Sequence, residues 1–170
     1  MDGVNVQEIV QKSQATLMRF CRDYKIFIDT CAIMDSNIKA FYLHIREYLL
    51  EFNSKIYVPY RVVDELNKNF QVLEKRESVI EALTFLEVLN SDGLLSIIGD
   101  DTDENFVDNL FLTKFTGMVM EQKVLLVTQD KRLATDVLNL NRRESVRNVN
   151  AICVGRINNY GYLSNFFQKS

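Results

Sequence analysis

Acidic side chains follow apolar, β-branched-rich runs at three places in this chain. They are Asp29 after residues 26–28, the pair Asp64 and Glu65 shortly after residues 56–59, and Asp130 after residues 125–128. If the three runs are parallel strands, their carboxyl ends meet at one edge of a sheet, where open α/β folds bind their ligands. Carboxylate oxygens without nearby His or Cys ligands suit Mg²⁺ or Mn²⁺. The pattern therefore predicts a metal site at that edge.

Strands and helices alternate along the sequence in a way that would position these acids. The apolar spacing predicts strands at 25–29, 55–58, 94–98, 123–128 and 149–154, and helices at 6–22, 40–52, 61–69, 72–89, about 100–121 and 131–140. The strands are not joined by two-residue hairpin turns, which implies right-handed crossovers and a mostly parallel sheet covered on both faces. We expect an α/β fold of three α/β/α layers with a central sheet of about five strands.

The composition fits one domain in a reducing compartment. The chain has 170 residues with a hydrophobic fraction of 47% and a single proline, and it contains no linker-like stretch or repeat. No apolar run approaches the roughly 20 residues that span a bilayer, and the first residues do not resemble a signal peptide. The three cysteines (Cys21, Cys31 and Cys153) are expected to be small buried hydrophobes. We expect a cytoplasmic protein without a membrane partner.

The last quarter of the chain is basic, although the formal net charge is -3. Residues 131–170 contain seven Lys or Arg and two acids. A basic segment beside an acidic cluster suits a polyanion held by its phosphates, but a solvated helix face explains the same charges equally well.

Two of the acidic positions are ambiguous from spacing alone. Asp64 and Glu65 point about 100° apart on a helix, so only one of them can face the sheet edge. Asp108 lies inside the apolar segment 106–111, where a carboxylate needs a partner or a metal. Each acid also has an ordinary explanation, because Asp29 and Asp130 could cap helices and Asp108 could pair with Lys114.

Three sequence blocks resemble the PIN domains, a family of metal-dependent ribonucleases with a parallel α/β sheet. The blocks are KIFIDTC (25–31), VPYRVVDEL (58–66) and VLLVTQD (124–130), and the resemblance covers residues 25–154. It implies a nuclease domain in residues 25–155. Outside the resemblance, helical spacing predicts a lead-in helix in residues 1–24, and the Tyr and Phe residues of 156–170 indicate an aromatic tail that packs on the domain.

The resemblance also assigns roles to individual residues. It implies that four acids bind the metal and catalyse the reaction: Asp29, Glu65, Asp108 and Asp130, with Asp103 as the alternative to Asp108. Thr30 and Thr128 would be polar members of the substrate pocket. The phosphates of the substrate would meet the basic residues Lys131, Arg132, Arg142, Arg143 and Arg147.

The function implied is a Mg²⁺- or Mn²⁺-dependent endonuclease that hydrolyses RNA phosphodiester bonds. The alternative is a PIN-like RNA-binding or assembly module without catalysis. A toxin held by an antitoxin or another protein regulator, an RNA-processing or decay nuclease, and a phage or mobile-element defence factor would all show these motifs. The apolar stripe in 72–89 is compatible with a homodimer, although such a stripe is more often core.

Overall fold

The structure is a computed structural model, and it describes residues 5–99, 122–142 and 152–165. Its sheet has the strand order β3-β2-β1-β4-β5-β6, in which all neighbouring pairs are parallel except β5 and β6. The strands are β1 (Tyr24–Ile28), β2 (Ile56–Pro59), β3 (Leu95–Ile98), β4 (Lys123–Val127), β5 (Ile152–Ile157) and β6 (Leu163–Asn165).

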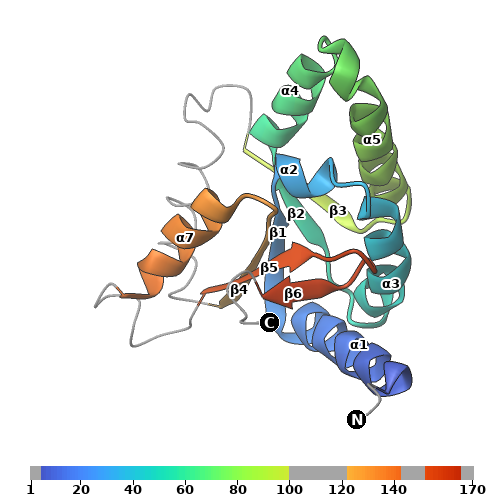
Figure 1. Ribbon diagram of the computed structural model, residues 1–170, viewed down its shortest axis with the longest axis vertical. Coiled ribbons are helices and arrows are strands. Elements are labelled where there is room, and N and C mark those ends of the chain that lie inside the picture. The colour runs from blue at the N-terminus through green and yellow to red at the C-terminus, as the bar shows by residue number, and fades with distance from the viewer. Residues whose placement is uncertain (1–4, 100–121, 143–151, 166–170) are drawn as a thin grey trace.

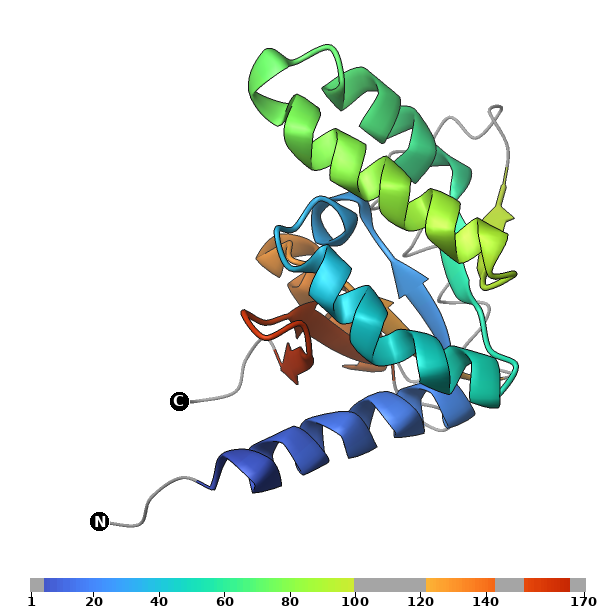
Figure 2. The ribbon, with the colours of Figure 1, turned by 90° about the vertical axis from the view of Figure 1, so that its right-hand side faces the viewer.

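The helices lie on both faces of this sheet and complete the three-layer α/β/α fold that the sequence predicted. They are α1 (Val6–Asp23), α2 (Thr30–Ile33), α3 (Ile38–Glu51), α4 (Tyr60–Asn69), α5 (Arg76–Ser91) and α7 (Lys131–Asn139), with 3₁₀ turns at Leu73–Lys75 and Leu140–Arg142. Helices α1, α3 and α5 pack in a row on one side, and α7 lies on the other (Figures 1 and 2).

The two central strands, β1 and β4, are continuously apolar in sequence because both are buried on both faces of the sheet. Residues 26–28 of β1 and 124–127 of β4 have no exposed surface, because helices cover both faces of the sheet there. Burying an apolar side chain of this size contributes about 1.5–3 kcal/mol. The central pair is therefore the most strongly fixed part of the fold, and the acids follow directly on its strands.

Most predicted elements occur within a few residues of their expected positions. Strand β5 is displaced from the expected 149–154 to Ile152–Ile157, and a 3₁₀ turn replaces the start of the helix expected at 72–89. The short helix α2 was anticipated only as a helix that Asp29 could cap, without bounds, because its four residues are too few for a periodic pattern. The helix expected at about 100–121 lies outside the described residues.

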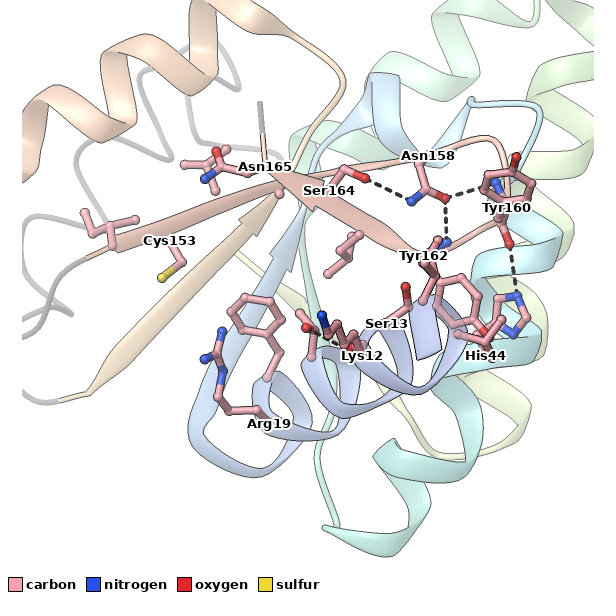
Figure 3. A pocket seen from close by; sticks show the side chains of 18 of the residues that line it. Lys12, Ser13, Arg19, His44, Cys153, Asn158, Tyr160, Tyr162, Ser164 and Asn165 are labelled. Carbon is pink, nitrogen blue, oxygen red and sulfur yellow. Dashed lines mark hydrogen bonds between the residues drawn. The ribbon is translucent and has the colours of Figure 1, made fainter. Parts of the chain in front are cut away.

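The segment expected to be a packing tail adds a sixth strand to the sheet. Strand β6 pairs antiparallel to β5, and the turn between them is organised by Asn158 (Figure 3). The Asn158 side chain accepts from the amides of Tyr160 and Tyr162 at 3.0 and 3.1 Å and donates to Ser164 at 2.9 Å. The buried Tyr162 ring stacks on His44 at 4.0 Å, so this segment does pack on the domain.

In the part of the chain that the structure describes, no helix is both long and apolar enough to cross a membrane.

Gly161 in this turn provides a test of the packing. Its φ is +80°, and an added Cβ would lie 2.6 Å from the Ala40 Cβ and 2.8 Å from the Phe41 nitrogen. Gly161→Ala should lower the free energy of unfolding by about 3 kcal/mol, since it combines left-handed strain with overpacking. Gly93→Ala is the control, because Gly93 has a φ of +73° but open space around it. Gly93→Ala should lower the free energy of unfolding, measured in urea, by only about 1 kcal/mol. Equal losses of stability in the two alanine variants would contradict the predicted clash at Gly161.

Candidate active site at the carboxyl edge of the sheet

Asp29 follows β1 directly and is held by the backbone on both sides. Its amide donates to the Val127 carbonyl at 3.2 Å, and its Oδ1 accepts from the Ala32 amide at 3.0 Å as the N-cap of α2. The residue is only 4% exposed. A carboxylate at this depth requires hydrogen-bond donors, and the cap supplies one of them.

Thr128 connects the acids that follow β1 and β4. Its hydroxyl donates to Asp29 Oδ2 and accepts from the Asp130 amide at 3.0 Å, while its own amide donates to the Gly155 carbonyl at 3.0 Å. The side chain has no exposed surface. One buried hydroxyl therefore fixes the position of Asp29 relative to the backbone of Asp130.

Asp130 is the N-cap of α7. Its Oδ1 accepts from the amides of Arg132 and Leu133 at 2.9 and 3.2 Å. The positive end of the helix dipole favours a negative charge at this position. Asp130 is half-buried, in contrast to the enclosed Asp29.

The structure separates Glu65 from Asp64, which spacing alone could not do. Glu65 Oε2 accepts from the Thr30 hydroxyl at 2.5 Å, so its carboxylate reaches the residue next to Asp29. Asp64 instead pairs with Arg61 at 3.5 Å and with Lys68 at 3.2 Å along α4. Glu65, and not its neighbour, belongs to the cluster at the sheet edge.

Cys31 is part of the same cluster, although we expected it to be a buried hydrophobe. Its thiol lies 3.2 Å from each carboxylate oxygen of Asp29 and 3.5 Å from the Thr128 hydroxyl. Burial, assisted by the Asp29 charge, raises the pKa of the Cys31 thiol to about 12. The thiol is therefore protonated at neutral pH and acts as a donor to Asp29, not as a nucleophile or a thiolate ligand. The sequence feature that could have indicated this role is the position of Cys31 directly after Asp29 and Thr30.

Gln129 is a second residue whose role the sequence did not indicate. Its carboxamide accepts from the Ile157 amide at 2.7 Å and donates to the Ile157 carbonyl at 2.9 Å and to Asp35 Oδ1 at 3.2 Å. These bonds replace the strand pairing that β4 no longer provides beyond Val127. They tie the segment between β4 and α7 to the end of β5.

Three of the four predicted acids thus lie at one edge of the sheet: the Thr128 hydroxyl bonds Asp29 and the Asp130 amide, and Glu65 accepts from Thr30, which follows Asp29 in the chain. The fourth, Asp108, and its alternative Asp103 lie outside the described residues. Within the described ranges, no three acidic, His or Cys side chains lie close enough together to hold a metal ion. The chemistry of the donors still fits Mg²⁺ or Mn²⁺, because oxygen atoms line the site and the only thiol is protonated.

The predicted phosphate-binding residues are only partly described. Lys131 and Arg132 are exposed in the first turn of α7, immediately after Asp130. Arg143 and Arg147 and the side chain of Arg142 lie outside the described residues. The structure therefore places two cations beside the acids on the β4 side.

Two hollows lie away from the acids. A groove of about 1070 Å³ runs between α1 and the β5–β6 pair, with Lys12, Ser13 and Asn165 among its lining residues (Figure 3). A second hollow of about 520 Å³ lies near the amino ends of β1 and β2 and includes Lys25 and Lys55. Asp29, Glu65 and Asp130 line neither of them.

No protein-family model and no curated protein matches this chain.

The buried hydroxyl of Thr128 should be essential for stability as well as for site geometry. Thr128→Val keeps the shape but removes the hydroxyl donor to Asp29 Oδ2 and leaves the Asp130 amide without its Thr128 acceptor, so unfolding should become about 3 kcal/mol easier. Thr128→Ser should recover most of this loss. Thr135→Val is the matched control, because the exposed Thr135 hydroxyl donates only to the Lys131 carbonyl at 2.9 Å. If Thr128→Val and Thr135→Val have the same free energy of unfolding in denaturant, the Thr128 hydroxyl does not have this stabilising role.

Proposed function

We propose that this protein is a PIN-like, metal-dependent endoribonuclease that hydrolyses RNA phosphodiester bonds. The observation that carries the proposal is the position of Asp29, Glu65 and Asp130 at the carboxyl edge of a parallel sheet, where Thr128 bonds Asp29 and the Asp130 amide and Thr30 bonds Glu65. Asp29 and Asp130 follow β1 and β4, Glu65 lies in α4, and the chain's single histidine, His44, contacts Tyr160 instead. A cation held by these carboxylates would supply the activated water that hydrolysis of a phosphodiester needs.

The three acids, together with Asp108, would hold Mg²⁺ or Mn²⁺. A bound ion of this kind supplies a water molecule of lowered pKa and positive charge near the leaving oxygen. Thr128 fixes the Asp29 carboxylate and the Asp130 backbone, and Thr30 orients the carboxylate of Glu65 through Oε2. The other oxygen of Glu65, Oε1, can then accept a hydrogen bond from an attacking water.

Lys131 and Arg132 would bind the phosphates of the RNA strand. Both side chains are exposed directly after Asp130, at the positive end of α7. Phosphate contacts give affinity that falls with salt but carry no sequence information.

We place the reaction in the cytoplasm, where free thiols such as Cys21, Cys31 and Cys153 persist. A toxin controlled by an antitoxin, an RNA-processing or decay nuclease and a defence factor would use the same site.

A non-catalytic RNA-binding or assembly module is the second candidate. It is favoured by the hydrogen bonds that Asp29 already accepts at both carboxylate oxygens, from Ala32, Cys31 and Thr128. In this alternative, the acids serve as helix caps and as links between strands.

Activity measurements separate the two candidates. Purified protein with Mn²⁺ should cleave single-stranded RNA, and Asp29→Asn and Asp130→Asn should each lower the rate by about 100-fold, the upper end of losses seen when support of a metal site is removed. Asp136→Asn is the control, since Asp136 is exposed farther along α7. Metal-replete wild-type protein that leaves every tested RNA intact would support the non-catalytic module.

Metal binding can be tested without measuring cleavage. Mn²⁺ at a hundredfold excess over its Kd should stabilise the fold by about 2.7 kcal/mol, and EDTA should reverse the effect. The cation relieves repulsion among the carboxylates, so Asp130→Asn should reduce the thermal shift and Asp136→Asn should not. A shift of the same size in both variants would place the ion elsewhere.

A further inference from the structure

The hollow near the amino ends of β1 and β2 is lined largely by basic and polar residues. Its volume is about 520 Å³, and its charged lining residues are the cations Arg22, Lys25 and Lys55 and the acid Asp23. These residues leave a surplus of two positive charges, whereas the whole chain has a formal net charge of -3. A hollow lined mainly by charges of one sign concentrates ions of the opposite sign.

Asp23 does not balance the two lysines, because it is already paired with Arg22. Both of its carboxylate oxygens accept from the Arg22 guanidinium, at 3.0 Å each. This hydrogen bonding is the main cause that lowers the pKa of Asp23. In the described part of the chain, Lys25 and Lys55 form no ion pair. The two ammonium groups are therefore left without a counter-charge from the described residues.

The register of the sheet places these two lysines opposite one another. Ile26 of β1 pairs with Ile56 of β2, and Lys25 and Lys55 directly precede this pair. Their backbones are consequently about 4.8 Å apart, the spacing of neighbouring strands. Like charges that face each other across two strands are destabilising. A ligand that brings negative charge between the two lysines would remove this cost.

Lys25 is held at the hollow by aromatic side chains. Its Nζ lies 4.3 Å from the centroid of the Tyr57 ring and 5.9 Å from that of the Phe27 ring. The Lys25 side chain is half-buried, and Lys55 is exposed to solvent. An aromatic ring attracts the ammonium group but supplies no oxygen acceptor for its three N–H donors. The contact therefore positions a cation whose donors can still bind an anion.

Neutral hydrogen-bonding side chains complete the lining of the hollow. Asn53, Ser54 and Ser96 line it, and within the described residues their side chains make no hydrogen bond. Lysine, serine and asparagine side chains are all common donors to phosphate oxygens. The volume of about 520 Å³ lies within the roughly 300–1,000 Å³ that is typical of small-molecule sites. The hollow therefore has room for a ligand larger than a phosphate ion.

We propose that this hollow binds the phosphate monoester of a nucleotide, with the phosphate between the ammonium groups of Lys25 and Lys55. A phosphate monoester carries a charge of about −1.5 to −2 at pH 7, which matches the surplus of two positive charges. A free nucleotide and the 5′-phosphate end of an RNA strand both carry this group. Lys25 is four residues before Asp29, roughly 13 Å along β1. The site is therefore separate from the acids and does not depend on the proposed nuclease activity.

Calorimetric titration with AMP in EDTA tests the site without metal or cleavage. Lys55→Gln should weaken AMP binding about 10-fold, because it removes one of the two charge-assisted contacts. Adenosine, which lacks the phosphate, should bind more weakly than AMP by at least the same factor. Lys12→Gln is the matched control, since Lys12 is exposed and already pairs with Glu8 at 3.9 Å, and it should change Kd less than about twofold. No saturable AMP binding by the wild-type protein, or equal losses in the two glutamine variants, would overturn the proposal.

Stability measurements separate a binding role from a structural one. Lys55→Gln removes the repulsion between two ammonium groups, so the urea midpoint of the nucleotide-free protein should stay the same or rise. Lys25→Gln also loses the contact with Tyr57, so it is compared with Lys25→Arg, which keeps both the charge and the ring contact. Lys25→Arg should retain most of the AMP affinity that Lys25→Gln loses. A lowered midpoint in Lys55→Gln, or equal loss of AMP binding in both Lys25 variants, would overturn the proposal.

Two short single-stranded RNAs of the same sequence identify the source of the phosphate. If the RNA with a 5′-phosphate binds more tightly than the RNA with a 5′-hydroxyl, and Lys55→Gln removes the difference, the end of an RNA strand is a ligand of this site. If AMP binds through Lys55 and the two RNAs bind equally well, the ligand is a free nucleotide. Both results support a monoester site. Inorganic phosphate that fails to displace AMP, or adenosine that binds as tightly as AMP, would overturn it.

Discussion

The hydrogen bonds of the Thr128 hydroxyl are the interaction on which the candidate site depends. This hydroxyl has no access to solvent, and it satisfies Asp29 on one side and the Asp130 backbone on the other. A single buried group with two obligatory partners permits one arrangement of the ends of β1 and β4. The carboxylates are consequently positioned by a polar contact inside the protein as well as by the loops that carry them.

The same contact explains how the sheet holds negative charge at its edge. Asp29 and Asp130 each receive backbone donors as helix caps, so both carboxylates are stabilised locally before any cation is considered. Cys31 adds a protonated thiol to Asp29, and Thr30 adds a hydroxyl to Glu65.

Beyond the acids, side-chain contacts replace backbone pairing where the parallel sheet ends. Gln129 supplies the bonds that Ile157 would otherwise make with a longer β4, and Asn158 organises the reversal into β6. Farther away, Arg46 and Tyr42 both bond Asp92 and join α3 to the end of α5. The Asp92 carboxylate keeps a lowered pKa, mainly through its hydrogen bond to Arg46. The last of these contacts anchors α5, the helix that packs against α4 and hence against the element that carries Glu65.

The sequence by itself determined the α/β class, the four parallel strands nearest the acids and the position of Asp29 and Asp130 at strand ends. Apolar periodicity and buried β-branched runs are local properties, so they can be read without coordinates. It did not reveal β6 or the length of α2, since elements of three or four residues are too short to show a period, and it did not reveal the roles of Cys31 or Gln129. Residue spacing left Asp64 and Glu65 open and the sequence resemblance favoured Glu65, but the contact of Glu65 with Thr30 depends on which helix face meets the end of β1. Only the tertiary structure decides such contacts, because they join residues that are far apart in the chain and whose partners local spacing does not specify.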